Sequence, residues 1–130
     1  MRRMIVAAAM LLALGVGLGA FGAHALRMRL DPAMLAVWQT GVQYHLVHAM
    51  GALVVAMLAL TQPEMRLLRA ACALLLLGVL LFSGSLYVLA LSGARWLGVI
   101  TPLGGVAFIA GWLTLAIAAL RLPAQPAGGS

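Results

Sequence analysis

The sequence predicts an all-α membrane protein: an antiparallel bundle of four transmembrane helices, with a short interfacial segment before the second helix. Hydrophobic residues make up 65% of the 130-residue chain, whereas soluble domains contain roughly 45–50%. Four long apolar stretches hold most of them, and the eight basic and two acidic residues fall outside these stretches. A soluble fold could not bury this much apolar side chain, so the lipid bilayer is the expected environment.

The predicted helices lie in a single domain, residues 1–122, and each contains an apolar run close to the ~20 residues that cross about 30 Å of hydrocarbon. Their ranges are 4–26, 32–60, 64–92 and 102–120. The alternation of a β-strand is absent, and a helix satisfies every backbone group within lipid. Residues 32–39 precede the apolar run of the second helix and are predicted to lie at the interface. Residues 123–130, PAQPAGGS, are predicted to form a flexible tail.

Polar residues and prolines mark the ends of these helices. Asp31-Pro32 combines a helix N-cap with proline at the first helical position, and Thr101-Pro102 repeats this combination. Glu64 suits the positive N-terminal end of the third helix, and Ser92-Gly93 is a stop signal. The first helix could alternatively be a signal peptide, but its apolar run is longer than that of most signal peptides.

Arginines in the short connections predict the orientation. The N-terminus, the second loop and the C-terminal end carry five arginines, Arg2, Arg3, Arg66, Arg69 and Arg121, against three on the opposite side, Arg27, Arg29 and Arg95. The side richer in arginine is usually cytoplasmic. We therefore expect a multi-pass protein of the bacterial cytoplasmic (inner) membrane with both termini in the cytoplasm. Arginines that flank apolar runs are typical of headgroup anchors, so no nucleic-acid partner is expected.

Nearly every polar side chain within the spans falls in their extracytoplasmic half when the chain is threaded up and down. The resulting candidate ligand-binding cluster comprises His24, Gln43, Tyr44, His45, His48, Ser83, Ser85 and Tyr87. A helical wheel places Tyr44 and His48 on one face of the second helix, with His45 at its edge. Because polar groups in membranes turn toward the bundle, Tyr44 and His48 are expected to hydrogen-bond across helices.

Small residues on the same faces predict close helix–helix contacts. The expected packing glycines are Gly15, Gly19, Gly22, Gly41, Gly51, Gly84, Gly104 and Gly111. Aromatic residues are expected at two depths. Trp38 and Trp96 are predicted near the outer interface, where indoles usually lie, and Trp112 in the core.

The polar residues do not form a complete catalytic or metal-binding set. His24, His45 and His48 could together ligate a metal or haem, but the only acidic residues, Asp31 and Glu64, lie in loops on opposite sides of the membrane. We therefore expect no metal, no cofactor and no enzymatic activity. The mid-helix hydroxyls of Ser83 and Ser85 are expected to bond to their own backbone. The lone Cys72 cannot form an intrachain disulfide.

Four motifs resemble the transmembrane-protein-256-like family of small membrane proteins. They are GAFGAHAL at 19–26, WQTGVQYHLVHA at 38–49, FSGSLYVLALSG at 82–93 and ITPLGG at 100–105. The resemblance implies an integral membrane protein of four helices with no established activity, and it assigns no catalytic residue. One departure is Ala25, where the family pattern leads us to expect glycine.

Three functional interpretations remain open. The favoured one is a non-enzymatic structural, accessory or assembly component that acts through helix–helix contacts with another membrane protein or a second copy. The alternative is a site for a small molecule, lipid, quinone, metal or haem in the outer half of the bundle. A third is an oligomeric transporter or pore, which is disfavoured because no acidic residue lies inside a span.

Overall fold

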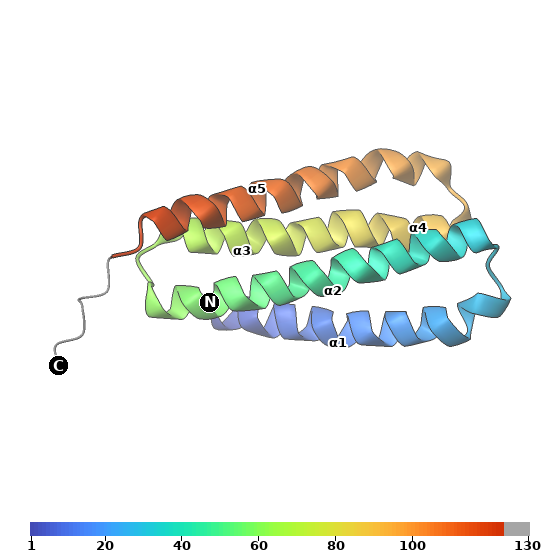
Figure 1. The fold of residues 1–130 in the computed structure, drawn as a ribbon, viewed down its shortest axis with the longest axis horizontal. Helices are drawn as coiled ribbons and strands as arrows, with labels where there is room; N and C mark the ends of the chain where they lie inside the picture. The colour runs from blue at the N-terminus through green and yellow to red at the C-terminus, as the bar shows by residue number, and fades with distance from the viewer. Residues whose placement is uncertain (124–130) are drawn as a thin grey trace.

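Four long helices run up and down beside one another, which confirms the predicted all-α fold (Figure 1). The computed structural model describes residues 1–123, so the predicted tail from residue 124 onward lies outside the described part. All four helices are long and apolar enough to cross a membrane. The start of the first helix, the end of the last helix and the second connection lie at one end of the bundle, and the first and third connections lie at the other, which we call the distal end (Figure 1).

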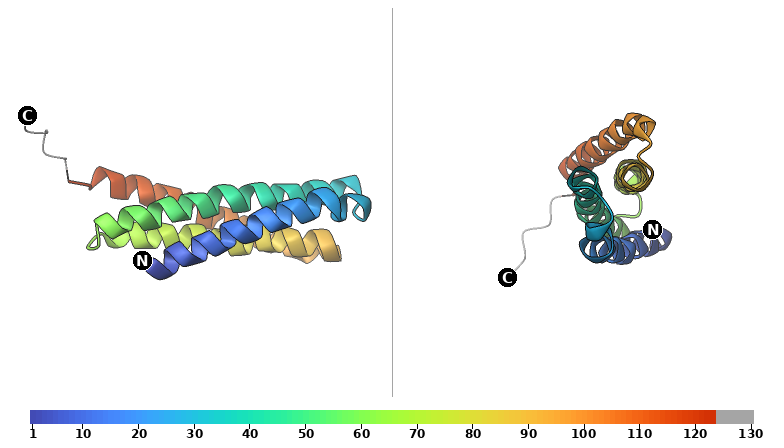
Figure 2. Two further views of the ribbon diagram at one scale, coloured as in Figure 1. Left: turned by 90° about the horizontal axis from the view of Figure 1, so that it is seen from below. Right: turned by 90° about the vertical axis from the view of Figure 1, so that its right-hand side faces the viewer.

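The helices form a staggered rather than a square arrangement (Figure 2). The elements are α1 (Arg2–His24), α2 (Pro32–Thr61), α3 (Arg66–Gly78), η2 (Val79–Ser83), α4 (Gly84–Ser92) and α5 (Ile100–Leu120), with short 3₁₀ turns η1 (Leu26–Met28) and η3 (Arg95–Val99). The α2 helix and the α3–η2–α4 rod lie centrally. The α1 helix packs on α2, and α5 packs on α3, so α1 and α5 occupy opposite edges.

The helix starts differ in part from those predicted. Asp31 caps α2 as expected, because its Oδ1 accepts a hydrogen bond of 2.8 Å from the backbone N–H of Met34. The α2 helix then continues without a break through residue 40, so residues 32–39 form its first turns, and their interfacial position stays a prediction. The third helix starts at Arg66, after Glu64. The last helix starts at Ile100 without a side-chain cap, so the Thr101 cap was a wrong prediction.

One turn of π-helix, η2, interrupts the third span (Val79–Ser83), which the sequence did not predict. A π turn adds one residue to the helical repeat and so changes the direction of the side chains that follow. Here it follows Gly78 and ends at Ser83, so the polar residues of α4 lie beyond it. The rod ends where predicted, at Ser92, with Gly93 in the left-handed conformation (φ 70°) that glycine adopts without strain.

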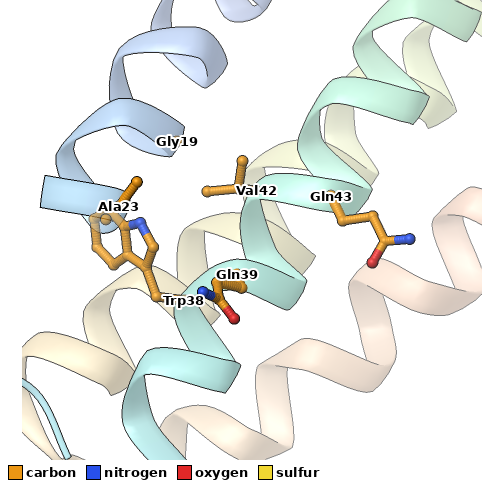
Figure 3. A pocket seen from close by; sticks show the side chains of 7 residues that line it. Gly19, Ala23, Trp38, Gln39, Val42 and Gln43 are labelled. Carbon is orange, nitrogen blue, oxygen red and sulfur yellow. The ribbon is translucent and has the colours of Figure 1, made fainter. Parts of the chain in front are cut away.

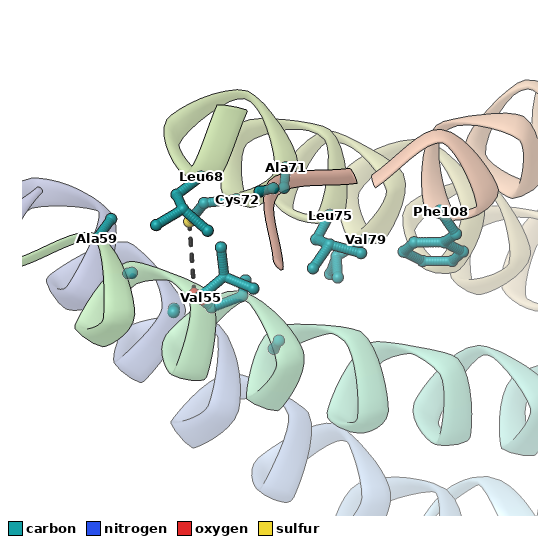
Figure 4. Packing of buried hydrophobic residues seen from close by; sticks show 13 residues of the cluster. Val55, Ala59, Leu68, Ala71, Cys72, Leu75, Val79 and Phe108 are labelled. Atoms are coloured by element: carbon teal, nitrogen blue, oxygen red, sulfur yellow. Dashed lines mark hydrogen bonds between the residues drawn. The ribbon is translucent and has the colours of Figure 1, made fainter. Parts of the chain in front are cut away.

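The larger of two hydrophobic clusters lies between α1, α2, the third span and α5, and Figure 4 shows its packing. Small residues of α2, such as Ala52 and Ala56, lie against larger ones of α3, including Leu68 and Leu75, all of them fully buried. The thiol of Cys72 points from α3 to the backbone of α2, where it lies 3.4 Å from the carbonyl of Ala52 (Figure 4). Its burial keeps this cysteine out of reach of a second chain.

Most of the predicted packing glycines receive a side chain of a neighbouring helix. A methyl group would lie within 3.2 Å of another helix at Gly15, Gly19, Gly22, Gly41, Gly51, Gly104 and Gly111. Gly84 was wrongly predicted, because nothing lies within 4 Å of such a group. Its Cα instead borders a hollow that is also lined by Leu14 of α1 and His45 of α2. Gly78, which the sequence analysis missed, is covered by the ring of Phe108.

Gly104 and Gly105 offer a matched test of this packing. A methyl group at Gly104 would lie 2.7 Å from the Cα of Phe82, whereas one at Gly105 would meet its nearest neighbour at 3.9 Å. We expect Gly104→Ala to lower the free energy of unfolding by about 1–3 kcal/mol, because backbone cannot move aside cheaply. Gly105→Ala should cause no loss. Denaturation in mixed micelles, followed by circular dichroism, measures both, and equal effects would contradict the predicted close approach of α5.

Candidate functional site

His45 joins three helices at the centre of the bundle and is almost fully buried, with 2% of its surface exposed. Its Nε2 lies 2.7 Å from the carbonyl oxygen of Leu11 on α1, and its Nδ1 lies 2.9 Å from the hydroxyl of Tyr87 on α4. A carbonyl oxygen only accepts, so Nε2 carries the proton. In the neutral ring Nδ1 then accepts from the Tyr87 hydroxyl. Both nitrogens are therefore engaged within the protein.

Two serines tie the third span to its neighbours. The Ser83 hydroxyl donates to the carbonyl of Gly41 on α2 at 2.7 Å, so the expectation that it bonds to its own helix was wrong. The cause is the π turn, which places Ser83 against α2. The Ser85 hydroxyl follows the expectation, since it donates to Phe82 of its own helix at 2.9 Å, and it also lies 2.7 Å from the hydroxyl of Thr101 on α5.

Trp38 is buried inside the bundle, in a small cluster with Leu26 and Ala90. It is buried between α1 and α2, and its indole N–H donates to the carbonyl of Leu18 at 3.0 Å. Its ring covers Gly22 and lies 4.7 Å, centroid to centroid, from that of Tyr87. Figure 3 shows the indole turned toward the end of α1. Trp96, in contrast, is exposed as expected of an interfacial indole.

Tyr44 and His48 do not form the predicted hydrogen bonds across helices. The Nδ1 of His48 lies 2.7 Å from the carbonyl of Tyr44 in its own helix, so Nδ1 carries the proton and Nε2 is the acceptor in the neutral ring. The ring stacks on Phe108 of α5 with 3.5 Å between centroids. Tyr44 stacks on Phe82 at 4.5 Å. On this face of α2 the two rings meet Phe82 of the third span and Phe108 of α5, and the indole of Trp112 lies 5.9 Å from the His48 ring between centroids.

A pocket of about 180 Å³ lies beside these two rings and is lined by Gln43, Tyr44, Val47 and His48. We call it the Gln43 pocket. A second hollow of similar volume lies between α1 and α2 and is bordered by Trp38, Gln39 and Gln43, among others. Figure 3 shows this second hollow, with Trp38 directed to α1 and Gln43 directed away from it. The amide of Gln43 therefore belongs with the Gln43 pocket.

His24 stands apart from the rest of the predicted cluster. It is exposed at the end of α1, and the part of the chain that the structure describes offers its ring no hydrogen bond. The ring points outward because Gly22, two residues earlier, is the residue that faces α2. Among residues 1–123, no three histidine, cysteine or acidic side chains come close enough to hold a metal ion.

Comparison with known proteins identifies the family. The family model described as "Protein of unknown function (DUF423)" matches residues 18–105. The chain belongs to the DUF423 family. The matching description does not include the transmembrane-protein-256-like label, so that finer resemblance stays a prediction. The match covers α1 from Leu18 through the first turns of α5, which includes the histidines, serines and tyrosines described above.

Proteins similar to this chain are membrane proteins by name. The chain is 47% identical to the "UPF0382 membrane protein YwdK" of Bacillus subtilis, over 93% of this chain and 98% of that one. It is 40% identical to the "UPF0382 inner membrane protein YgdD" of Escherichia coli, over 93% and 92% of the two chains. No solved structure matches the chain significantly. These names and the four apolar helices establish an integral membrane protein.

The two tyrosines give a matched test of the polar contacts. The Tyr87 hydroxyl bonds to His45, whereas the Tyr44 hydroxyl has no partner among residues 1–123. We expect Tyr87→Phe to lower the free energy of unfolding by about 1 kcal/mol, since it leaves Nδ1 of His45 without a donor. Tyr44→Phe should change it by less than about 0.5 kcal/mol. Micelle denaturation of both variants checks this, and a loss as large for Tyr44→Phe would refute the assignment.

Proposed function

We propose that this DUF423 protein is a non-enzymatic accessory or assembly component that acts through helix contacts with another membrane protein or a second copy. The proposal rests on one observation: buried polar side chains of the bundle form their hydrogen bonds within the protein. Both nitrogens of His45 are bonded within the protein. The hydroxyls of Ser83 and Ser85 bond to a carbonyl or to Thr101 rather than to a histidine. Neither serine hydroxyl contacts a histidine among the described residues, so no serine–histidine pair forms there.

The contact face that we propose lies on α1. The glycine stripe of α1 at Gly15, Gly19 and Gly22 is occupied by side chains of α2, so it is not available to a partner. The opposite side of α1 is exposed and carries Gly17, against which nothing lies within 4 Å. Small residues at spacings of four, Ala9 and Ala13, precede Gly17 on this side and are exposed as well. Such spacing lets a second helix approach closely.

The same proposal includes an orientation. The arginine excess supports a cytoplasmic location of both termini, and an even number of spans puts both ends on one side. The inner-membrane name of the Escherichia coli relative supports a bacterial cytoplasmic membrane for this chain. In this orientation the distal end, with His45 and the Gln43 pocket beneath it, faces away from the cytoplasm.

A second candidate function is a small-molecule site. The specific observation in its favour is the Gln43 pocket, into which polar groups of α2 open without an internal partner. A metal or haem site has less support, because the described residues bring no three ligands together. A transporter or pore would require an oligomer with a polar path between its copies.

A photo-reactive amino acid at Met10, on the exposed side of α1, tests the contact proposal. We expect irradiation of native membranes to yield one cross-linked product of defined mass. The matched control is the same substitution at Val106 of α5, which is equally exposed and should give only lipid adducts. Equal products from both positions, or none from Met10, would contradict an α1 interface.

Reporter fusions test the orientation. An alkaline phosphatase domain joined after Leu120 should stay inactive, because it would remain in the cytoplasm, and one joined within the connection at Arg27–Arg29 should be active. The double variant Arg66→Gln, Arg69→Gln removes the arginine excess from the side of the termini. It should therefore raise the phosphatase activity of the fusion after Leu120. Activity of the unaltered C-terminal fusion would overturn the orientation.

A further inference from the structure

The ring of His48 has one nitrogen, Nε2, that forms no hydrogen bond within the described chain. His48 is more than nine-tenths buried, and its Nδ1–H is taken by the carbonyl of Tyr44. Within residues 1–123 no group bonds to Nε2 of His48. Every side-chain nitrogen or oxygen there that is fully enclosed has a hydrogen-bond partner, so Nε2 is not fully enclosed. The Nε2 atom is therefore accessible, and His48 lines the Gln43 pocket. It presents a lone pair that accepts a hydrogen bond.

Two further polar groups border the same pocket. The amide of Gln43 and the hydroxyl of Tyr44 have no hydrogen-bond partner in the described chain. Gln43 is exposed on the side of the bundle and lies about 16 Å along α2 from Pro32, at ~1.5 Å per residue, well away from the helix end. Polar groups at such depth are costly without a partner. Both groups can donate and accept, whereas Nε2 only accepts.

The size and walls of the pocket select the shape of its occupant. A volume of about 180 Å³ compares with the ~150 Å³ cavity that holds a benzene ring, and it is smaller than the ~300 Å³ or more of sites for drug-sized molecules. The rings of Tyr44 and His48 lie nearly parallel, with 11° between their planes. Such a wall favours a single planar ring. Val47, which is 55% exposed, leaves the mouth open toward the acyl chains.

We propose that the Gln43 pocket binds a lipid-soluble molecule whose head is a hydroxylated aromatic ring, such as a phenol or a quinol. The ring hydroxyl donates to Nε2 of His48, and the Gln43 amide or the Tyr44 hydroxyl bonds to oxygen on the ring. An aliphatic tail leaves through the mouth beside Val47. The oxidised quinone lacks the O–H donor and binds more weakly. This inference develops the second candidate function and rests on it, and it is independent of the α1 contact face.

The test compares two probes, which share one alkylphenyl skeleton and differ by a single O-methyl group, with the purified protein in phosphatidylcholine nanodiscs. Radiolabelled 4-nonylphenol has the donor, and its methyl ether does not. We expect the protein to retain the phenol at least about tenfold more tightly than the ether, after subtraction of what protein-free nanodiscs retain. The ¹⁵N resonance of His48 Nε2 should move with the phenol and stay in place with the ether.

Three variants assign the binding to this pocket. His48→Phe keeps the ring that stacks on Phe108 but lacks Nε2, and Gln43→Leu removes the amide; each should weaken phenol binding about tenfold. Gln39→Leu is the matched control, because Gln39 lies one turn away and borders the other hollow, and its affinity should equal that of the unaltered protein. Equal retention of phenol and ether overturns the proposal, and so does a loss in Gln39→Leu as large as in Gln43→Leu. Cross-linking from Met10 is unaffected by either result, so failure here is distinguishable from failure of the accessory role.

Discussion

The hydrogen bonds of His45 are the interaction on which the distal half of the bundle depends. Lipid offers no partner to a polar side chain, so an imidazole in a span must be satisfied by the protein. His45 uses a backbone carbonyl of α1 on one side and the Tyr87 hydroxyl on the other, and so fixes α1, α2 and α4 relative to one another. Ser83 adds a bond to Gly41 close by. The polarity of this region thus holds helices together.

Close packing of rings on glycines complements these bonds. Trp38 covers Gly22, Tyr87 covers Gly41 and Trp112 covers Gly51. In lipid the association of helices gains little from the hydrophobic effect, so contact between well-matched surfaces must supply the attraction. Each glycine accepts one ring of a neighbouring helix, which sets the register between the two helices. The glycine stripes are consequently internal features, and the surface left for partners lies elsewhere.

The two histidines of α2 differ in what remains free. His45 has no unused nitrogen, whereas His48 retains an accessible Nε2 beside a pocket. They are three residues apart and so point about 60° apart around the helix, one toward α1 and α4 and the other toward α5. Neighbouring residues of one type thereby serve different purposes: one joins helices, and the other is available to a molecule from the membrane.

The sequence by itself determined the membrane environment, the number of spans, the start of α2 at Asp31-Pro32 and the end of the third span at Gly93, because these depend on local hydrophobicity and local backbone preferences. It also indicated most of the packing glycines. Only the tertiary structure decided which histidine bridges helices, that Ser83 bonds across to α2, that His24 faces outward and that no side chain packs closely on Gly84. Those outcomes depend on the rotation of each helix about its axis, which the packing of several helices sets together. The π turn at Val79–Ser83 shifts that rotation midway along a span, and a regular helical wheel cannot represent such a shift.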